Sequence, residues 1–105
     1  MNRHPLAVVQ ENDEILFNEL MSTAKLALED GALPAKVKYL IAMALDASLG
    51  AATGVKSLAQ QAMTHGATKD EVFDALRVTY HICGAGSVYT AAAGLNDVFG
   101  NSKSL

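Results

Sequence analysis

The chain has 105 residues and a formal net charge of −3; 50% of its residues are hydrophobic and 18% are charged. This length fits a single domain, residues 1–105, and this balance excludes an intrinsically disordered chain. The eight basic residues form no basic stripe, and no apolar run approaches 18 residues, so neither nucleic acid nor a membrane is an expected partner.

The composition favours helices over strands, because 18 alanines and four methionines accompany only six aromatic residues. The first predicted helix covers residues 6–29, with a break point near Asn12. Its apolar stripe consists of Ile15, Leu16, Leu20, Ala24, Ala27 and Leu28. We expect Gly31 to end this segment in a left-handed conformation and Pro34 to open the next helix.

Four further helices are predicted after Pro34. The next helix, residues 35–49, is apolar almost all round and is expected to be the most buried. Another covers residues 52–64, one begins at Thr68 with a capping box that Glu71 completes, and one covers residues 87–99. The predicted fold is a compact all-α bundle of about five helices with its core in residues 30–99.

No sharp catalytic or metal-binding motif is present: the chain has no HExxH, no glycine-rich phosphate loop and no CxxC. The three histidines are not spaced as metal ligands, so we expect no metal and no cofactor. The single cysteine, Cys83, forms no disulfide within the chain, and the first residues carry no signal-peptide run. Both features favour a cytoplasmic protein.

Polar residues inside the apolar helices are the candidate site residues. Asp46 follows an apolar run and shares a helical face with Tyr39. A buried carboxylate with a raised pKa would serve as a general base, and the Tyr39 hydroxyl would orient a substrate. The structural alternative is that Asp46 accepts hydrogen bonds from the N-terminus of the next helix, and this alternative has the greater weight.

His81 and Cys83 lie near the end of the helix that begins at Thr68. A thiol and an imidazole two residues apart point to different faces of a helix, which disfavours a nucleophilic pair. The structural alternatives are a buried small hydrophobe for Cys83 and a cation near a helix C-terminus for His81.

Three segments stand in an order and spacing typical of one known family: GALPAK at 31–36, YLIAMAL at 39–45 and AMTHGATKDEV at 62–72. In these segments the chain resembles the carboxymuconolactone decarboxylase and alkylhydroperoxidase D-like family. The resemblance covers roughly residues 30–99. It implies an all-helical fold that assembles into trimers or hexamers, with the active site near subunit contacts.

The resemblance does not carry the family's chemistry to this chain. Peroxidase members have a CxxC followed four residues later by histidine, and those positions are Ala51, Gly54 and Leu58 here. The decarboxylase branch also places a histidine at the position of Leu58. The glutamate that precedes the cysteines falls on Tyr39, and Thr53 lies between the two lost cysteine positions.

Three functional hypotheses follow. The leading one is a homo-oligomeric family member of unassigned activity, without the dithiol centre, whose pocket is lined by Tyr39, Asp46 and Thr53. The second is a decarboxylase-type enzyme for a small organic acid, with an acid–base site rearranged among Tyr39, Asp46, Lys56 and His81. The third is a non-catalytic oligomeric binding or scaffold protein.

Overall fold

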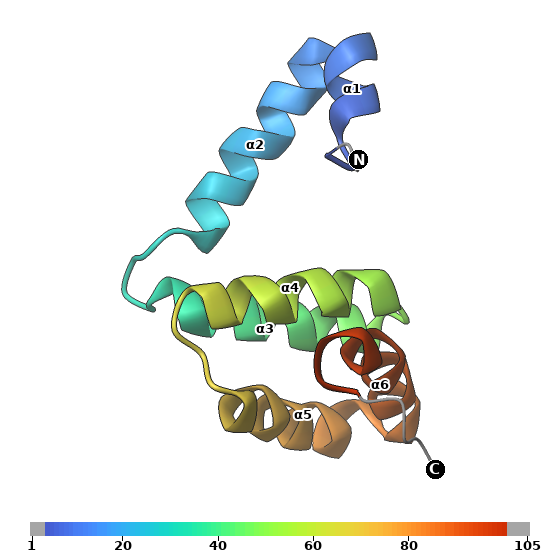
Figure 1. Cartoon of the computed structure of the whole chain (residues 1–105). Coiled ribbons are helices and arrows are strands. Elements are labelled where there is room, and N and C mark those ends of the chain that lie inside the picture. Colours follow the sequence, from blue (N-terminus) through green and yellow to red (C-terminus); the bar gives the residue numbers. More distant parts are fainter. Residues whose placement is uncertain (1–3, 101–105) are drawn as a thin grey trace.

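The computed structural model of the chain describes residues 4–100, and every regular element in this range is an α-helix (Figure 1). The helices are α1 (Ala7–Asn12), α2 (Glu14–Leu28), α3 (Ala35–Ser48), α4 (Ala52–Thr64), α5 (Lys69–Cys83) and α6 (Ala85–Phe99). The predicted all-α class is therefore confirmed. Within residues 4–100, none of the helices has both the length and the apolar character that a membrane crossing requires.

The extra helix arises from the break predicted near Asn12. Asp13 leaves the helical conformation, with φ −150° and ψ 84°, and its carboxylate accepts a hydrogen bond from the Leu16 N–H at 3.0 Å. This side chain caps a new helix one residue after the first one ends. The predicted helix over residues 6–29 is therefore two helices, α1 and α2.

The structure corrects two details of the predicted boundaries. Gly31 does not adopt the left-handed conformation expected of it; among the described residues positive φ angles occur at Gly50, Gly66 and Gly84. Helix α2 ends at Leu28. Pro34 opens α3 as predicted, and the Asp30 carboxylate also caps this helix by accepting the Ala35 N–H at 2.7 Å. Helix α6 begins at Ala85, two residues before the predicted start, because the chain turns at Gly84 alone.

The predicted capping box at the start of α5 is confirmed. The Thr68 hydroxyl accepts the Glu71 N–H at 3.1 Å, and Glu71 Oε1 accepts the Thr68 N–H at 2.9 Å. The other carboxylate oxygen of Glu71 lies 3.1 Å from the Lys36 ammonium of α3. The Thr68 N–H, followed by Lys36, lowers the pKa of Glu71. The capping box thus also connects α5 to α3.

Helices α3–α6 form one body with a single hydrophobic core. Each helix contributes two residues to it: Met43 and Ala47, Val55 and Ala59, Val72 and Leu76, Ala91 and Leu95. Helix α3 is central, since it contacts α2, α4, α5 and α6. It has the smallest share of exposed residues among the helices, as was expected from its composition, although Ile41 and Leu45 are exposed on its outer side.

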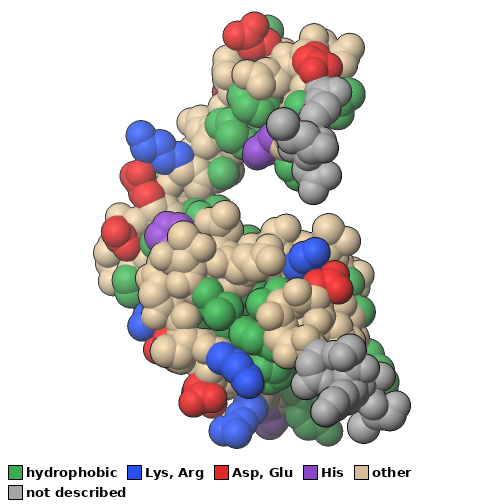
Figure 2. All heavy atoms as spheres, viewed as in Figure 1, with side chains coloured by type: hydrophobic (Ala, Val, Ile, Leu, Met, Phe, Trp, Pro, Cys, Tyr) green, Lys and Arg blue, Asp and Glu red, His purple; other side chains and the backbone are tan. Residues whose placement is uncertain are grey.

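Helices α1 and α2 form an arm that projects away from this body (Figure 1). The main contacts of α2 are with α1 and with α3, and none of its 15 residues is buried. The first half of the predicted stripe, Ile15, Leu16 and Leu20, is therefore exposed, while Ala24 and Leu28 of its second half are half-buried. Figure 2 shows hydrophobic side chains on the surface of the arm.

Candidate functional site

Tyr39 of α3 and His65 at the end of α4 are brought together by the antiparallel packing of these two helices. Their ring centroids are 4.9 Å apart, and the ring planes are inclined by 28°, which is a stacked arrangement. Tyr39 lies one turn into α3, and His65 is the residue that ends α4. A phenol and an imidazole, two groups that exchange protons, therefore share one end of the α3–α4 pair.

One nitrogen of His65 is held by the backbone. Its Nδ1 lies 2.8 Å from the carbonyl oxygen of Gln61, one turn earlier in α4. A carbonyl oxygen only accepts hydrogen bonds, so Nδ1 is the donor and carries a proton. The remaining nitrogen, Nε2, is then the atom free to take up or release a proton. This is the arrangement that a histidine needs for acid–base chemistry.

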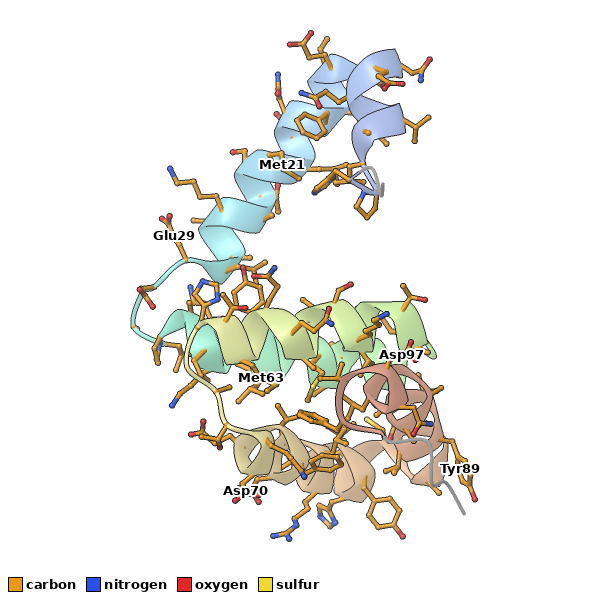
Figure 3. The ribbon with its side chains drawn as sticks, viewed as in Figure 1. Met21, Glu29, Met63, Asp70, Tyr89 and Asp97 are labelled. Atoms are coloured by element: carbon orange, nitrogen blue, oxygen red, sulfur yellow. The ribbon has the colours of Figure 1, made fainter. Side chains whose placement is uncertain are left out.

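A surface pocket of about 340 Å³ adjoins this pair. It lies where the base of the arm meets the body; Figure 3 places Glu29 at this junction. Its lining comes from the end of α2, the loop that follows and the ends of α3 and α4: Ala24, Lys25, Leu28, Glu29, Asp30, Ala35, Tyr39 and His65. The Asp30 carboxylate is already engaged by the Ala35 N–H. Lys25 supplies the ammonium group of the pocket.

Asp46 lies at the opposite end of the α3–α4 pair. Tyr39 and Asp46 are two turns apart, about 10 Å along the axis of α3. The half-buried Asp46 carboxylate packs against Gly54 of α4, where it occupies the space that a Cβ at residue 54 would need. Tyr39 and Asp46 therefore do not meet in one pocket within a chain.

The structural alternative for Asp46 is not observed. Its carboxylate accepts no hydrogen bond from another residue of the described part of the chain; the Ala51 N–H goes to its backbone carbonyl, at 2.9 Å. The position of the Asp46 carboxylate and the absence of a side chain at Gly54 are thus sterically coupled.

We expect this coupling to be measurable as a double-mutant cycle. In an Asp46→Ala background, Gly54→Ala should stabilise the protein by about 1 kcal/mol, because alanine is the better helix residue. With Asp46 present, the new Cβ must displace the carboxylate, so the gain should vanish and the coupling energy should reach about 1–2 kcal/mol. Chemical denaturation of the four proteins gives both values. Equal effects of Gly54→Ala in the two backgrounds would show that the carboxylate moves aside without cost.

The other predicted site residues lie elsewhere. Thr53 is exposed on the first turn of α4. His81 is exposed in the last turn of α5, the position proposed for a cation near the helix C-terminus. Cys83 is exposed at the end of α5, so its interpretation as a buried hydrophobe is wrong. The five candidates occupy three regions of the chain, and the catalytic role of each stays a prediction.

His65 is the site residue that the sequence patterns did not select, since they show only that the three histidines are not spaced as metal ligands. Its partner Tyr39 is 26 positions away, and the pair forms only because α3 and α4 run antiparallel. One feature of the sequence could have indicated the pair. The helix before Gly66 ends at His65, and in an antiparallel pair the end of α4 lies beside the beginning of α3. Among the described residues, no group of three histidine, cysteine or acidic side chains is placed to hold a metal ion.

Comparison with known proteins agrees with the fold. The carboxymuconolactone decarboxylase family profile matches residues 16–97. The apo crystal structure of a carboxymuconolactone decarboxylase family protein from Legionella pneumophila is similar, with a TM-score of 0.83 and 30% identity, over 91% of this chain and 88% of that one. An uncharacterized protein of Cupriavidus necator is 37% identical over 70 residues, which are 66% of this chain and 62% of that relative. The match thus spans less than two thirds of that relative's length.

Proposed function

The chain belongs to the carboxymuconolactone decarboxylase family, and from this premise we propose that it acts on a small organic acid by acid–base chemistry at the pocket of Tyr39 and His65. The observation that carries the proposal is the stack of these two rings beside a pocket, with Nδ1 of His65 held by the Gln61 carbonyl. We place this activity in the cytoplasm, where the lone thiol of Cys83 would stay reduced.

The proposed reaction is the decarboxylation of a lactone acid. The bond between the ring carbon and the carboxylate breaks, CO₂ leaves, and the electron pair is delocalised onto the lactone carbonyl as an enolate. A proton is then returned to carbon, so that one proton replaces one CO₂. The Tyr39 hydroxyl would donate a hydrogen bond to the developing enolate. His65, as the imidazolium, would deliver its Nε2 proton to carbon and take up another from water after the reaction. The Lys25 ammonium would meet the substrate anion.

Dithiol peroxidase chemistry has little support in this chain. It needs a thiolate that attacks the peroxide and a second thiol that resolves the sulfenic acid. Cys83 is the one cysteine of the sequence, and it lies on α5 rather than at the beginning of α4. Ala51 and Gly54, at the cysteine positions, carry no group that replaces either thiol.

The proposal is tested with the protein purified from its own cells without denaturing steps. A native mass spectrum should show a retained organic acid, and incubation with carboxymuconolactone should release CO₂. The same preparation should not accelerate peroxide consumption when a dithiol is supplied as reductant. Thiol-dependent peroxide consumption without any CO₂ release would contradict the proposal.

A second candidate function, a non-catalytic binding or scaffold protein, is favoured by one observation. Asp46, Thr53, His81 and Cys83 are dispersed over the ends of α3, α4 and α5 and form no common cluster. A protein of this kind would bind a small acid at the pocket without changing it. Saturable turnover of any substrate would exclude this candidate.

A further inference from the structure

A hollow larger than the pocket of Tyr39 and His65 lies between α5 and α6. Its volume is about 890 Å³, within the range of roughly 300–1,000 Å³ that is typical of small-molecule sites. It shares no lining residue with the Tyr39–His65 pocket, which lies at the base of the arm. A ligand bound here would therefore be independent of the proposed decarboxylation.

The hollow is a groove that follows both helices. Its lining residues on α5 run from Lys69 to Tyr80, which is about 17 Å along the helix axis, and those on α6 run from Ala85 to Phe99. The two helices are antiparallel, so the beginning of α5 lies beside the end of α6: the Lys69 ammonium is 5.9 Å from the centroid of the Phe99 ring. A groove of this length suits an extended chain better than a compact ring.

The floor of the groove is apolar. It is formed by Phe73 and Leu76 of α5 and by Val88, Leu95 and Phe99 of α6. Leu76 and Leu95 belong to the hydrophobic core, whereas Phe73 is 42% exposed although its ring centroid lies 5.7 Å from that of Phe99. An apolar chain on this floor would cover Phe73 and would itself leave water, and both changes favour binding.

The charged groups of the groove are basic. Lys69 and Arg77 line it, and no carboxylate is among its described lining residues, although the net charge of the chain is −3. The Tyr39–His65 pocket and the hollow between α3 and α5 both include acidic residues. Arg77 is 3.7 Å from the Asp74 carboxylate, but both side chains are at least 76% exposed, so this pair is weak. In Figure 2 basic side chains lie over α5 next to hydrophobic surface. The groove therefore favours an anion.

We propose that the α5–α6 groove binds a free organic acid with a long unbranched apolar chain. The carboxylate would meet the Lys69 ammonium and the Asn96 amide, which lie at the same end of the groove. The chain would follow the apolar floor toward Tyr80 and Tyr89 at the other end. A concave groove takes up one chain, whereas a membrane presents a broad surface, so a free acid is the occupant that fits.

Ala92 leaves the middle of the groove open and provides a variant that closes it. It is an exposed residue of α6 whose side chain is a single methyl group, and it lines the groove. Ala93, the next residue, is also exposed but does not line the groove. Leucine at residue 92 would fill the groove, whereas leucine at residue 93 would lie about 100° further round the helix. Leucine is a strong helix former, so both variants should fold.

The test is isothermal titration calorimetry of the full chain with dodecanoate, a twelve-carbon acid, below the concentration at which it forms micelles. We expect one dodecanoate per chain with a Kd of about 10–100 µM. Ala92→Leu should weaken binding about ten-fold or more, while Ala93→Leu should bind like the wild type. Lys69→Gln should weaken binding about five-fold, as expected for one exposed ion pair, and Lys38→Gln on α3 should not.

Chain length and charge supply two further comparisons. Hexanoate fills only half of the groove, so its affinity should be at least about 30-fold lower than that of dodecanoate. Dodecylammonium has the same chain with the opposite charge and should bind more weakly than dodecanoate. Equal binding of the two ions would overturn the proposal, because the cations of the groove would then play no part in recognition.

The remaining outcomes that would overturn the proposal concern where and what the chain binds. Loss of dodecanoate binding in Ala44→Leu, which fills the hollow between α3 and α5, but not in Ala92→Leu would place the acid in that hollow. Association with phosphatidylglycerol vesicles without any binding of free dodecanoate would identify a membrane surface as the partner. Absence of both kinds of binding, with a native mass above that of one chain, would show that another copy covers the groove. Tyr39→Phe should bind dodecanoate like the wild type, which separates this site from the proposed decarboxylation.

Discussion

Gly94→Ala is expected to lower the free energy of unfolding by about 2 kcal/mol, although alanine is the better helix residue. Gly94 is buried in α6 where that helix crosses α4. A Cβ at this position would collide with the Ala52 carbonyl oxygen and lie 3.1 Å from the Lys56 nitrogen. Both atoms are backbone and cannot rotate away, so α4 and α6 would have to separate.

Gly86→Ala is the matched control in the same helix. A Cβ at Gly86, in the first turn of α6, meets no atom within 4 Å, so this substitution should be neutral or slightly stabilising. Urea denaturation of the two variants and the wild type measures the difference in the free energy of unfolding. If Gly94→Ala were as stable as Gly86→Ala, the close approach of α4 and α6 would not require a glycine at residue 94.

The parts of the fold that depend on neighbouring residues were predictable. The capping box at Thr68 and Glu71 is complete within four residues, and the break near Asn12 needs only the Asp13 side chain. The same reasoning was wrong at Gly31, because α2 already ends at Leu28 with Glu29 extended, and the loop after it is held by a contact across it, from the Ala35 N–H to the Asp30 carboxylate. Helix boundaries that depend on such contacts cannot be predicted from the helix propensity of the neighbouring residues.

Burial was less predictable than helix position. The first predicted helix has its apolar stripe, but Ile15, Leu16 and Leu20 of this stripe face solvent in the structure. Hydrophobic periodicity indicates that a face requires a partner and does not say whether the partner belongs to the same chain.

The candidate site could be predicted only in part. Tyr39 was selected from its helical face, but the predicted partner, Asp46, shares that face two turns away and packs on Gly54 instead. In the structure the partner of Tyr39 is His65, which lies at the end of α4 beside the beginning of α3. A pair formed by two antiparallel helices depends on their register, and a single sequence without a structure does not fix that register.

The largest functional effect is expected at this pair. Tyr39→Phe keeps the ring that stacks on His65 and removes only the hydroxyl, while His65→Gln keeps a hydrogen-bonding side chain and removes the proton-exchanging ring. Each variant should lower the rate of CO₂ release from the lactone acid about 100-fold or more, the usual contribution of a positioned acid or base. Thermal unfolding should change little, because both side chains lie outside the core.

Two further variants decide where the chemistry takes place. Tyr80→Phe, on the exposed side of α5, controls for the loss of a phenol elsewhere and should turn over like the wild type. His81→Gln tests the imidazole that the sequence analysis selected at the end of the same helix, and it should also leave the rate unchanged. If His81→Gln abolished turnover while His65→Gln did not, the acid–base site would lie at the end of α5, beside Cys83, and the Tyr39–His65 stack would be a structural contact only.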